Sequence, residues 1–596
     1  MAALGPAVVR AAPGGHRHGT GRAGAAAPGQ ALRGHDVPPG GAGLGHGAGE
    51  PDARPRPARS GGGVLMRRMR FPRLPGFAGP RPWGPSTGIA GPRTWGPLTK
   101  AAAGLLVLAV LCVGGWALYD WLRPDRTCAP GVDRRGAECV GVSDGGFSFA
   151  GNLDEVSARI KAENESVDRV PHVSVAIMIP MTAAEPFERR KVLSEVQGTY
   201  LAQYRANHRS NDQTPKIRLL LANPGRDHAY WPEVSDELAR RATTKDNLRA
   251  VVAFNVSVRA TQRAIARLTN ERHIPVVGGA VTANDIGNSA AHPDAYKGFV
   301  RVLPTTRDQA AALKSFNKDM DPRHSLVVED LRQDDNYTVS LKNAFHELTK
   351  GAPRAPEQYR SPTDFSKEGS TSNDFHQMVN TICNSTAEDI YFAGRPVQLR
   401  QFINELGARA CTDKQYRVVS GYAASTLSSD AKLNWDALRD GVTVEYASVS
   451  HPDAWTTPDA PATGGSKAAY EELSNLAAEA TSKPVGPIGR VDLTDSRTVT
   501  THDAAWTAIT AIRNNSRNGA GIPGLDQVRN AWLRLHGADK VQGASGWICL
   551  DNYGNPYDKA VPVVRLNPRT RSVDFVGHAW PEHGKPPAED CTAGGE

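Results

Sequence analysis

The residue spacings that support catalysis are missing from this sequence. The Gly-Ala-Ser-Gly-Trp stretch at 543–547 places its Ser differently from the GxSxG nucleophile turn. His346-Glu347 is followed by Lys350 instead of a second His, so the zinc motif HExxH is absent, and no GxxxxGK[ST] phosphate loop occurs. The acidic pair Asp334-Asp335 stands at an expected helix start, where the helix dipole explains it. We therefore expect neither an enzyme nor a metal or cofactor site.

The cysteines point to an oxidising compartment. Cys112 lies in a long apolar segment, and none of the other six shows the CxxC or clustered-His spacing of a metal site. Neighbours in the sequence suggest three disulfides, and free buried thiols are the alternative. The candidate pairs are Cys128–Cys139, Cys383–Cys411 and Cys549–Cys591.

Short apolar runs alternate with amphipathic stretches from Pro171 onward. The runs have the length and composition of strands but no internal alternation of polar and apolar residues, which indicates strands covered on both faces. Parallel sheets with helices on either side, a doubly wound α/β class, follow from this pattern, and the length favours two lobes. The predicted strands are 173–180, 217–223, 250–255, 274–279, 299–304, 325–330, 389–394, 416–422 and 442–448.

Four segments together resemble type I periplasmic binding proteins, specifically the branched-chain amino acid (Leu/Ile/Val) binding family. They are Val251–Ser257, the IPVVGGAVT stretch at 274–282, Val327–Asp330 with Asp335-Asn336-Tyr337, and GASGWICLD at 543–551 with Gly554. The last is similar to the family's GxxGxIxFDxxGD hairpin, with Asn555 where a final Asp is usual. The resemblance covers about residues 171–580. It implies two lobes joined by a hinge, with a ligand held between them.

The candidate ligand residues follow predicted strands, because ligands of open α/β sheets bind beyond the carboxyl ends of the strands. Ser257 could bind a carboxylate together with the free N–H groups of the next helix, or it could be a plain N-cap. Arg395 could pair bidentately with an acidic ligand, or lie solvated at the surface. The resemblance gives Ala280 a carbonyl contact and Thr282 a hydroxyl contact with an amino acid ligand; an ordinary turn between strand and helix is the alternative.

Two tyrosines complete the candidate site. Tyr337 could wall the cleft or lie in the core. Tyr422 stands where amino acid-binding relatives supply an acid, and no Asp or Glu occurs before Asp430. This departure puts an amino acid ligand in doubt.

The N-terminal part of the chain has a different character. Residues 1–100 hold 14 Lys and Arg against three acids, so they account for the whole excess of the net charge of +8. The rest of the chain shows no excess of basic residues of the kind that binds nucleic acid. Residues 101–119 contain no charge, and a helix over 101–122 is long enough to span a bilayer. The flanking charges place the N-terminus in the cytoplasm and the remainder outside. A cleaved signal peptide, or lipidation at Cys112, is an alternative.

These features predict a division into seven parts. They are a disordered basic segment (1–100), a transmembrane anchor (101–122), a stalk (123–170), lobe 1 (171–310), lobe 2 (311–452), a return to lobe 1 with a closing hairpin (453–580) and a tail (581–596). The resulting hypothesis is a membrane-anchored extracytoplasmic solute-binding protein that delivers a small polar, amino acid-like or carboxylate ligand to an ABC permease. A ligand-sensing ectodomain without a transport role is the alternative.

Overall fold

The computed structural model describes residues 106, 108–112, 115, 127–211, 213–516 and 521–592. The expected basic segment (1–100) and most of the expected membrane span (101–122) lie outside these residues. Within the described part of the chain, no helix is both long and apolar enough to cross a membrane.

Lobe 1 is built on an eight-stranded sheet with the order β1-β2-β3-β5-β4-β6-β7-β8. The five strands β5-β4-β6-β7-β8 run parallel, and the hairpin strands β1–β3 extend one edge antiparallel. The strands are β1 Thr127–Ala129, β2 Val132–Arg135, β3 Glu138–Ser143, β4 His172–Met178, β5 Lys216–Asn223, β6 Leu248–Ala253, β7 Val276–Gly278 and β8 Phe299–Arg301.

Lobe 2 repeats the same parallel order. Its seven-stranded sheet runs β10-β9-β11-β12-β13-β16-β17, with β10 to β13 parallel and the hairpin β16–β17 antiparallel at one edge. The strands are β9 Ser325–Asp330, β10 Glu357–Tyr359, β11 Asp389–Ala393, β12 Tyr416–Ser420, β13 Val442–Ala447, β16 Val561–Asn567 and β17 Ser572–Ala579. A separate small hairpin joins β14 Val541–Gly543 to β15 Gly546–Ile548.

Helices cover both faces of each sheet, which is why the strands are apolar without alternation. In β4, Val175 and Ile177 pack with α2, α3 and α11, whereas Ala176 and Met178 pack with α4 and α5 on the other face. The helices of lobe 1 are α2 Asp154–Ser166, α3 Pro186–His208, α4 Trp231–Ala242, α5 Arg259–Ala266, α10 Lys467–Ala478, α11 Arg497–Asn514 and α12 Leu525–Ala531. Those of lobe 2 are α6 Thr306–Phe316, α7 Asn336–Leu348, α8 Ser372–Cys383 and α9 Pro396–Gly407.

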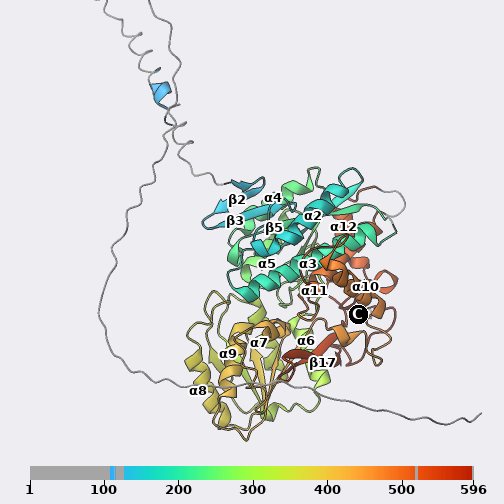
Figure 1. The fold of residues 1–596 in the computed structure, drawn as a ribbon. Coiled ribbons are helices and arrows are strands. Elements are labelled where there is room, and N and C mark those ends of the chain that lie inside the picture. The colour runs from blue at the N-terminus through green and yellow to red at the C-terminus, as the bar shows by residue number, and fades with distance from the viewer. Residues whose placement is uncertain are drawn as a thin grey trace, which may run out of the picture. The chain divides into compact units, whose positions relative to one another are not determined.

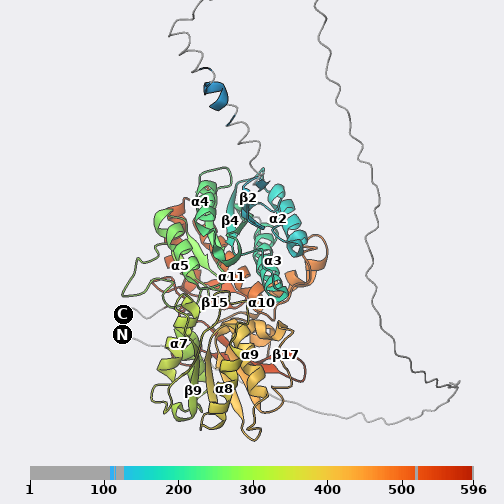
Figure 2. The same cartoon turned by 90° about the vertical axis from the view of Figure 1, so that its left-hand side faces the viewer.

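Each of the two lobes is built from more than one stretch of the chain (Figures 1 and 2). The backbone leaves lobe 1 after β8, returns to it after β13 and goes back to lobe 2 at β16, so three connections join the sheets within the described residues. The predicted α/β class is confirmed, with mixed sheets that fit a type I periplasmic-binding-protein fold.

Two predicted segments are wrong. The expected stalk at 123–170 instead contributes β1–β3 and α2 to lobe 1, because β3 pairs with β5 and α2 buries Val156 and Ile160. The segment 453–580 was expected to return to lobe 1, but its last part, β16–β17, joins lobe 2, because β16 pairs with β13.

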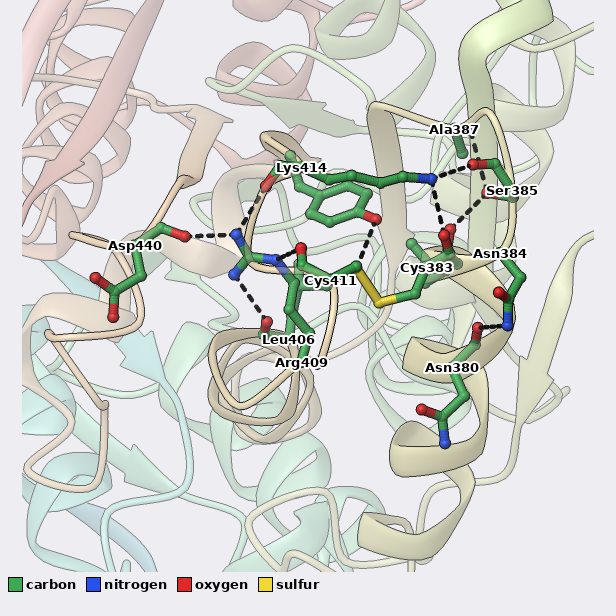
Figure 3. Close-up of a disulfide and its surroundings, with 12 residues drawn as sticks. Asn380, Cys383, Asn384, Ser385, Ala387, Leu406, Arg409, Cys411, Lys414 and Asp440 are labelled. Carbon is green, nitrogen blue, oxygen red and sulfur yellow. Dashed lines mark hydrogen bonds between the residues drawn. A yellow bond between two sulfur atoms is a disulfide. The ribbon is translucent and has the colours of Figure 1, made fainter.

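All three predicted disulfides form: Cys128–Cys139, Cys383–Cys411 and Cys549–Cys591. Cys383 ends α8 and Cys411 follows α9, so the second bridge ties two adjacent helices together (Figure 3). Lys414 fixes the same corner, because its Nζ donates to the carbonyl oxygens of Cys383 and Ser385, both at 2.8 Å. The third bridge holds Cys591, in the expected tail, against Trp547 and Cys549.

Candidate functional site

A cavity of about 90 Å³ lies between the lobes, at the carboxyl ends of β4, β5 and β6. Residues 180–185 follow β4, residues 226–228 follow β5, and Asn255 and Val256 follow β6; residues 364–367 of lobe 2 close it from the opposite side. In a sheet of this strand order, the connections from β4 and β6 leave toward opposite faces. Such a topological switch point is where ligands of open α/β sheets bind.

Ten of the sixteen residues that line this cavity are polar or charged, and they carry both signs of charge. Lys191 of α3 is 9 % exposed, and its Nζ lies 3.2 Å from Glu188 Oε2. Across the lobes, Lys367 Nζ lies 2.6 Å from Glu185 Oε1. These pairs place a cation and a carboxylate on the cavity wall at two separate points.

His228 is the most unusual group on the wall. It is 2 % exposed, and neither of its ring nitrogens has a hydrogen-bond partner among the described residues. Burial, helped by the charge of Lys191, lowers the pKa of His228 to about 3, so its ring is neutral. A neutral imidazole offers one donor and one acceptor, and the described residues use neither of them.

A second, smaller cavity of about 30 Å³ adjoins the first and shares Glu188, Lys191, Asn255 and Phe365 with it. Arg497, at the start of α11, lines its floor, with Nη1 3.9 Å from Glu195 Oε1 and 3.4 Å from Tyr422 Oη. The two cavities therefore form one polar region, which we call the interlobe site.

Glu195 is a buried acid behind this site. Asn255 Nδ2 donates to its Oε2 at 2.8 Å, whereas Oε1 has no hydrogen-bond partner in the described structure. Burial raises the pKa of Glu195 to about 7, against the lowering effect of Lys191 and Arg497. The protonation of Glu195 thus changes near neutral pH, directly beside Arg497.

We expect Glu195→Gln to change how stability depends on pH. Glu195 has an ordinary pKa of 4.5 and a folded pKa of about 7, so it stabilises the fold fully below pH 4.5 and loses that contribution as the pH rises through 7. The free energy of unfolding of the variant, relative to that of the wild type, should therefore rise by on the order of 2 kcal/mol as the pH is raised from about 5 to about 8. Urea unfolding of both proteins at each pH measures this difference. A difference that stays constant with pH would contradict the assignment.

The structure brings the six predicted ligand residues together where the lobes touch, but their polar groups mostly bind one another. Ser257 Oγ accepts from the backbone N–H groups of Thr282 at 3.1 Å and Ala283 at 3.3 Å. Val258, and not Ser257, is the N-cap of α5. Ser257 therefore joins two turns of lobe 1, while Thr282 Oγ1 is buried without a partner in the described part of the chain.

Arg395 differs from the prediction in its partner. Its Nε and Nη2 donate to the two oxygens of Asp335, both at 2.7 Å, so the bidentate contact expected for an acidic ligand is made within lobe 2. Burial would lower the pKa of Arg395, but Asp335 outweighs that effect and the net pKa is raised. The predicted contact chemistry is present, and the chain itself supplies the carboxylate.

The tyrosines link the lobes. Tyr422 Oη donates to the carbonyl oxygen of Ala280 at 3.1 Å, and the backbone N–H of Tyr337 donates to the carbonyl oxygen of Ser257 at 3.0 Å. The rings of Tyr337 and Tyr422 meet edge to face at 6.0 Å. Of the six predicted residues, Arg395 and Tyr422 line the smaller cavity; the other four line neither of the two cavities.

Sequence reasoning missed Lys191, His228 and Phe365. Gly225-Arg226-Asp227-His228 directly follows a predicted strand, so the rule that selected Ser257 could also have selected His228. Lys191 gave no signal, because a Lys on an amphipathic helix is typical of a solvated face. Phe365 lies in a loop with no distinctive spacing.

The chain matches no protein-family model and no curated protein. Among solved structures it is similar to the leucine-binding protein LivK of Thermotoga maritima, with 18 % identity, 69 % of this chain and 99 % of that chain covered, and a TM-score of 0.47. It is also similar to the branched-chain amino acid-binding protein LivJ of Streptococcus pneumoniae in complex with isoleucine (12 %, 69 % and 100 %, TM-score 0.47) and to a solute-binding protein of Rhodopseudomonas palustris in complex with 4-hydroxybenzoate (12 %, 68 % and 96 %, TM-score 0.47). These neighbours are ABC-transporter substrate-binding proteins of the type I periplasmic-binding-protein fold, the group that the sequence motifs resemble.

Proposed function

We propose that this protein is an extracytoplasmic solute-binding protein, anchored by residues 101–122, that captures a small amino acid-like zwitterion between its lobes for an ABC uptake transporter. The observation that carries the proposal is the interlobe site: a polar cavity at the switch point of lobe 1, closed by lobe 2 and lined by an unpartnered buried His228. A cavity with free hydrogen-bonding groups is sufficient for binding a ligand, and we assign no catalytic residue.

The charges on the wall favour a ligand with both signs. Asp227 of lobe 1 and Asp364 of lobe 2 line the same cavity, and neither has an ion-pair partner in the described structure. Burial and the charge of Asp364 raise the pKa of Asp227. An ammonium group between these carboxylates would relieve their repulsion, and Lys191 with His228 could receive a carboxylate.

The cavity must enlarge before such a ligand enters. At about 90 Å³ it is well below the roughly 300–1,000 Å³ of usual ligand sites. The three connections between the lobes allow hinge opening, which is the usual route in two-lobed binding proteins. Such opening would separate the contacts that Ser257 and Tyr422 make between the lobes.

The test is a thermal-shift screen of the purified full-length protein against amino acids and the matching carboxylic acids without the amine. Binding to the folded state raises the melting temperature. Lys191→Met should weaken the affinity of the best ligand about tenfold to a hundredfold, because one charge-assisted hydrogen bond is lost. Asp364→Asn should weaken only ligands that carry an amine.

Arg190→Met is the matched control, because Arg190 is the exposed neighbour of Lys191 on the same helix. It removes the same charge without touching the cavity, so its affinity should equal that of the wild type. A screen without any stabilising compound, or equal effects of Lys191→Met and Arg190→Met, would refute the proposed site.

A further inference from the structure

Lobe 1 has another cavity, far from the interlobe site. It measures about 310 Å³ and lies between the C-terminal ends of α3 and α11 and the strand β14. We call it the Trp506 groove, defined by Arg205, Trp506, Arg513, Lys540 and Gln542. Arg205 is 14 residues beyond Lys191 along α3, which places the groove about 21 Å from the interlobe site.

Two tightly packed helices form the base of this groove. α3 and α11 approach so closely that a Cβ at Gly198 would lie 2.1 Å from the carbonyl oxygen of Thr498. Farther along, Arg513 Nη2 donates to the carbonyl oxygens of Ala206 at 2.7 Å and Gln213 at 3.1 Å. The backbone thus fixes the position of Arg513 in the wall.

Three cations line the groove: Arg205, Arg513 and Lys540. No carboxylate of the described residues lies within 4.0 Å of the charged nitrogens of Arg205, Arg513 or Lys540. Arg513 is 4 % exposed, and within the described structure its Nε and Nη1 have no hydrogen-bond partner, nor does the buried Nη1 of Arg205. Buried cations that lack a partner are costly, so an anion at this position would stabilise the fold.

The pKa values of Arg513 and Arg205 also reflect their burial. Burial lowers the pKa of Arg513 to about 10 and also lowers the pKa of Arg205. Among the described residues, Lys540 Nζ donates only to backbone carbonyl oxygens, those of Gly537 at 3.3 Å and Glu589 at 2.9 Å. The same Nζ lies 4.5 Å from the centre of the Trp547 ring.

Trp506 supplies an apolar surface next to the cations. The guanidinium carbon of Arg205 lies 3.9 Å from the centre of the Trp506 ring, so that ring holds Arg205 in place. Trp506 is only partly buried and lines the groove together with Ile509 and Thr510. The groove therefore combines a cationic wall with an apolar one.

We propose that the Trp506 groove is a second ligand site, which binds a small organic oxyanion. Its phosphate or carboxylate group contacts Arg205, Arg513 and Lys540, and its apolar part lies against Trp506 and Ile509. This site is independent of the interlobe site and of the ligand proposed there.

The test uses calorimetry on the full-length protein with three probes. Inorganic phosphate carries the charge alone, phenyl phosphate adds a ring, and dihexanoylphosphatidylglycerol below its micelle concentration carries the anion as a lipid headgroup. Phenyl phosphate should bind more tightly than inorganic phosphate. Arg205→Gln and Lys540→Gln should each weaken phenyl phosphate about tenfold or more, because each loses a charge-assisted contact.

Arg209→Gln is the matched control, because Arg209 follows α3 one turn after Arg205 and pairs with Glu479 at 2.8 Å. Its affinity should equal that of the wild type. Tighter binding of the phospholipid, lost in the Arg205 and Lys540 variants, would support the site and identify a lipid headgroup as its source. The proposal is overturned if no probe gives saturable binding at millimolar concentration, or if Arg209→Gln weakens binding as much as Arg205→Gln. Lys540 is partly exposed at a loop end, so its variant should fold even if Arg205→Gln does not.

Discussion

Arg395→Met is expected to lower the free energy of unfolding by about 3–5 kcal/mol, because it leaves Asp335 buried without its counter-charge. Asp335 is 1 % exposed, and both of its oxygens accept from Arg395 at 2.7 Å. Replacing a buried ion pair on one side only removes the attraction while the desolvation cost of the other charge remains. Urea unfolding at neutral pH measures the loss.

The double variant Asp335→Asn/Arg395→Met separates this cause from lost packing. Asn removes the charge yet can still cap α7, as Asp335 does by accepting from the N–H of Thr338 at 3.2 Å. The double variant should therefore be more stable than Arg395→Met alone. Arg323→Met provides the surface control: Arg323 pairs with Asp321 while 81 % exposed, so its loss should change stability far less than Arg395→Met does. If Arg395→Met lowered the free energy of unfolding no more than Arg323→Met does, this prediction would be wrong.

Asp503→Ala is expected to cost a similar amount, about 3–5 kcal/mol, because Asp503 is the acceptor of a fully buried network. It is 0 % exposed and accepts from the N–H groups of Ala544 at 2.9 Å and Ser545 at 2.8 Å, and from Ser545 Oγ at 2.6 Å. These contacts fasten the β14–β15 hairpin to α11. Burial lowers the pKa of Lys559 to about 8, and the charge of Asp503 opposes that shift.

Two comparisons make this second prediction specific. Ser545→Ala removes a single hydrogen bond and should cost about 1 kcal/mol. Asp492 is an exposed acid in the turn before α11, and it accepts from the N–H of Thr494 at 2.8 Å. Asp492→Ala should cost no more stability than Ser545→Ala. Equal losses for Asp503→Ala and Asp492→Ala in urea unfolding would show that the buried network contributes nothing beyond a turn contact.

From the sequence alone, nine of the strands, the α/β class and the three disulfide pairs could be predicted. All nine predicted runs form strands, because a strand covered on both faces must be continuously apolar, and that property is local. The pairs Cys128–Cys139, Cys383–Cys411 and Cys549–Cys591 could be proposed because each joins neighbours along the chain. The carboxyl-end rule also placed Ser257, Ala280 and Arg395 near the contact between the lobes.

Only the tertiary structure decided which polar groups remain free. Arg395 has the residue type and position of a ligand contact, yet Asp335, 60 residues earlier, already neutralises it. His228 and Lys191 come from different elements, and their shared cavity depends on how α3 and the loop after β5 pack. The edge strands β1–β3 and β16–β17 likewise follow from pairing with distant partners. Hydrogen bonding and burial are pairwise properties of residues far apart in the chain, and a pattern of neighbours cannot encode them.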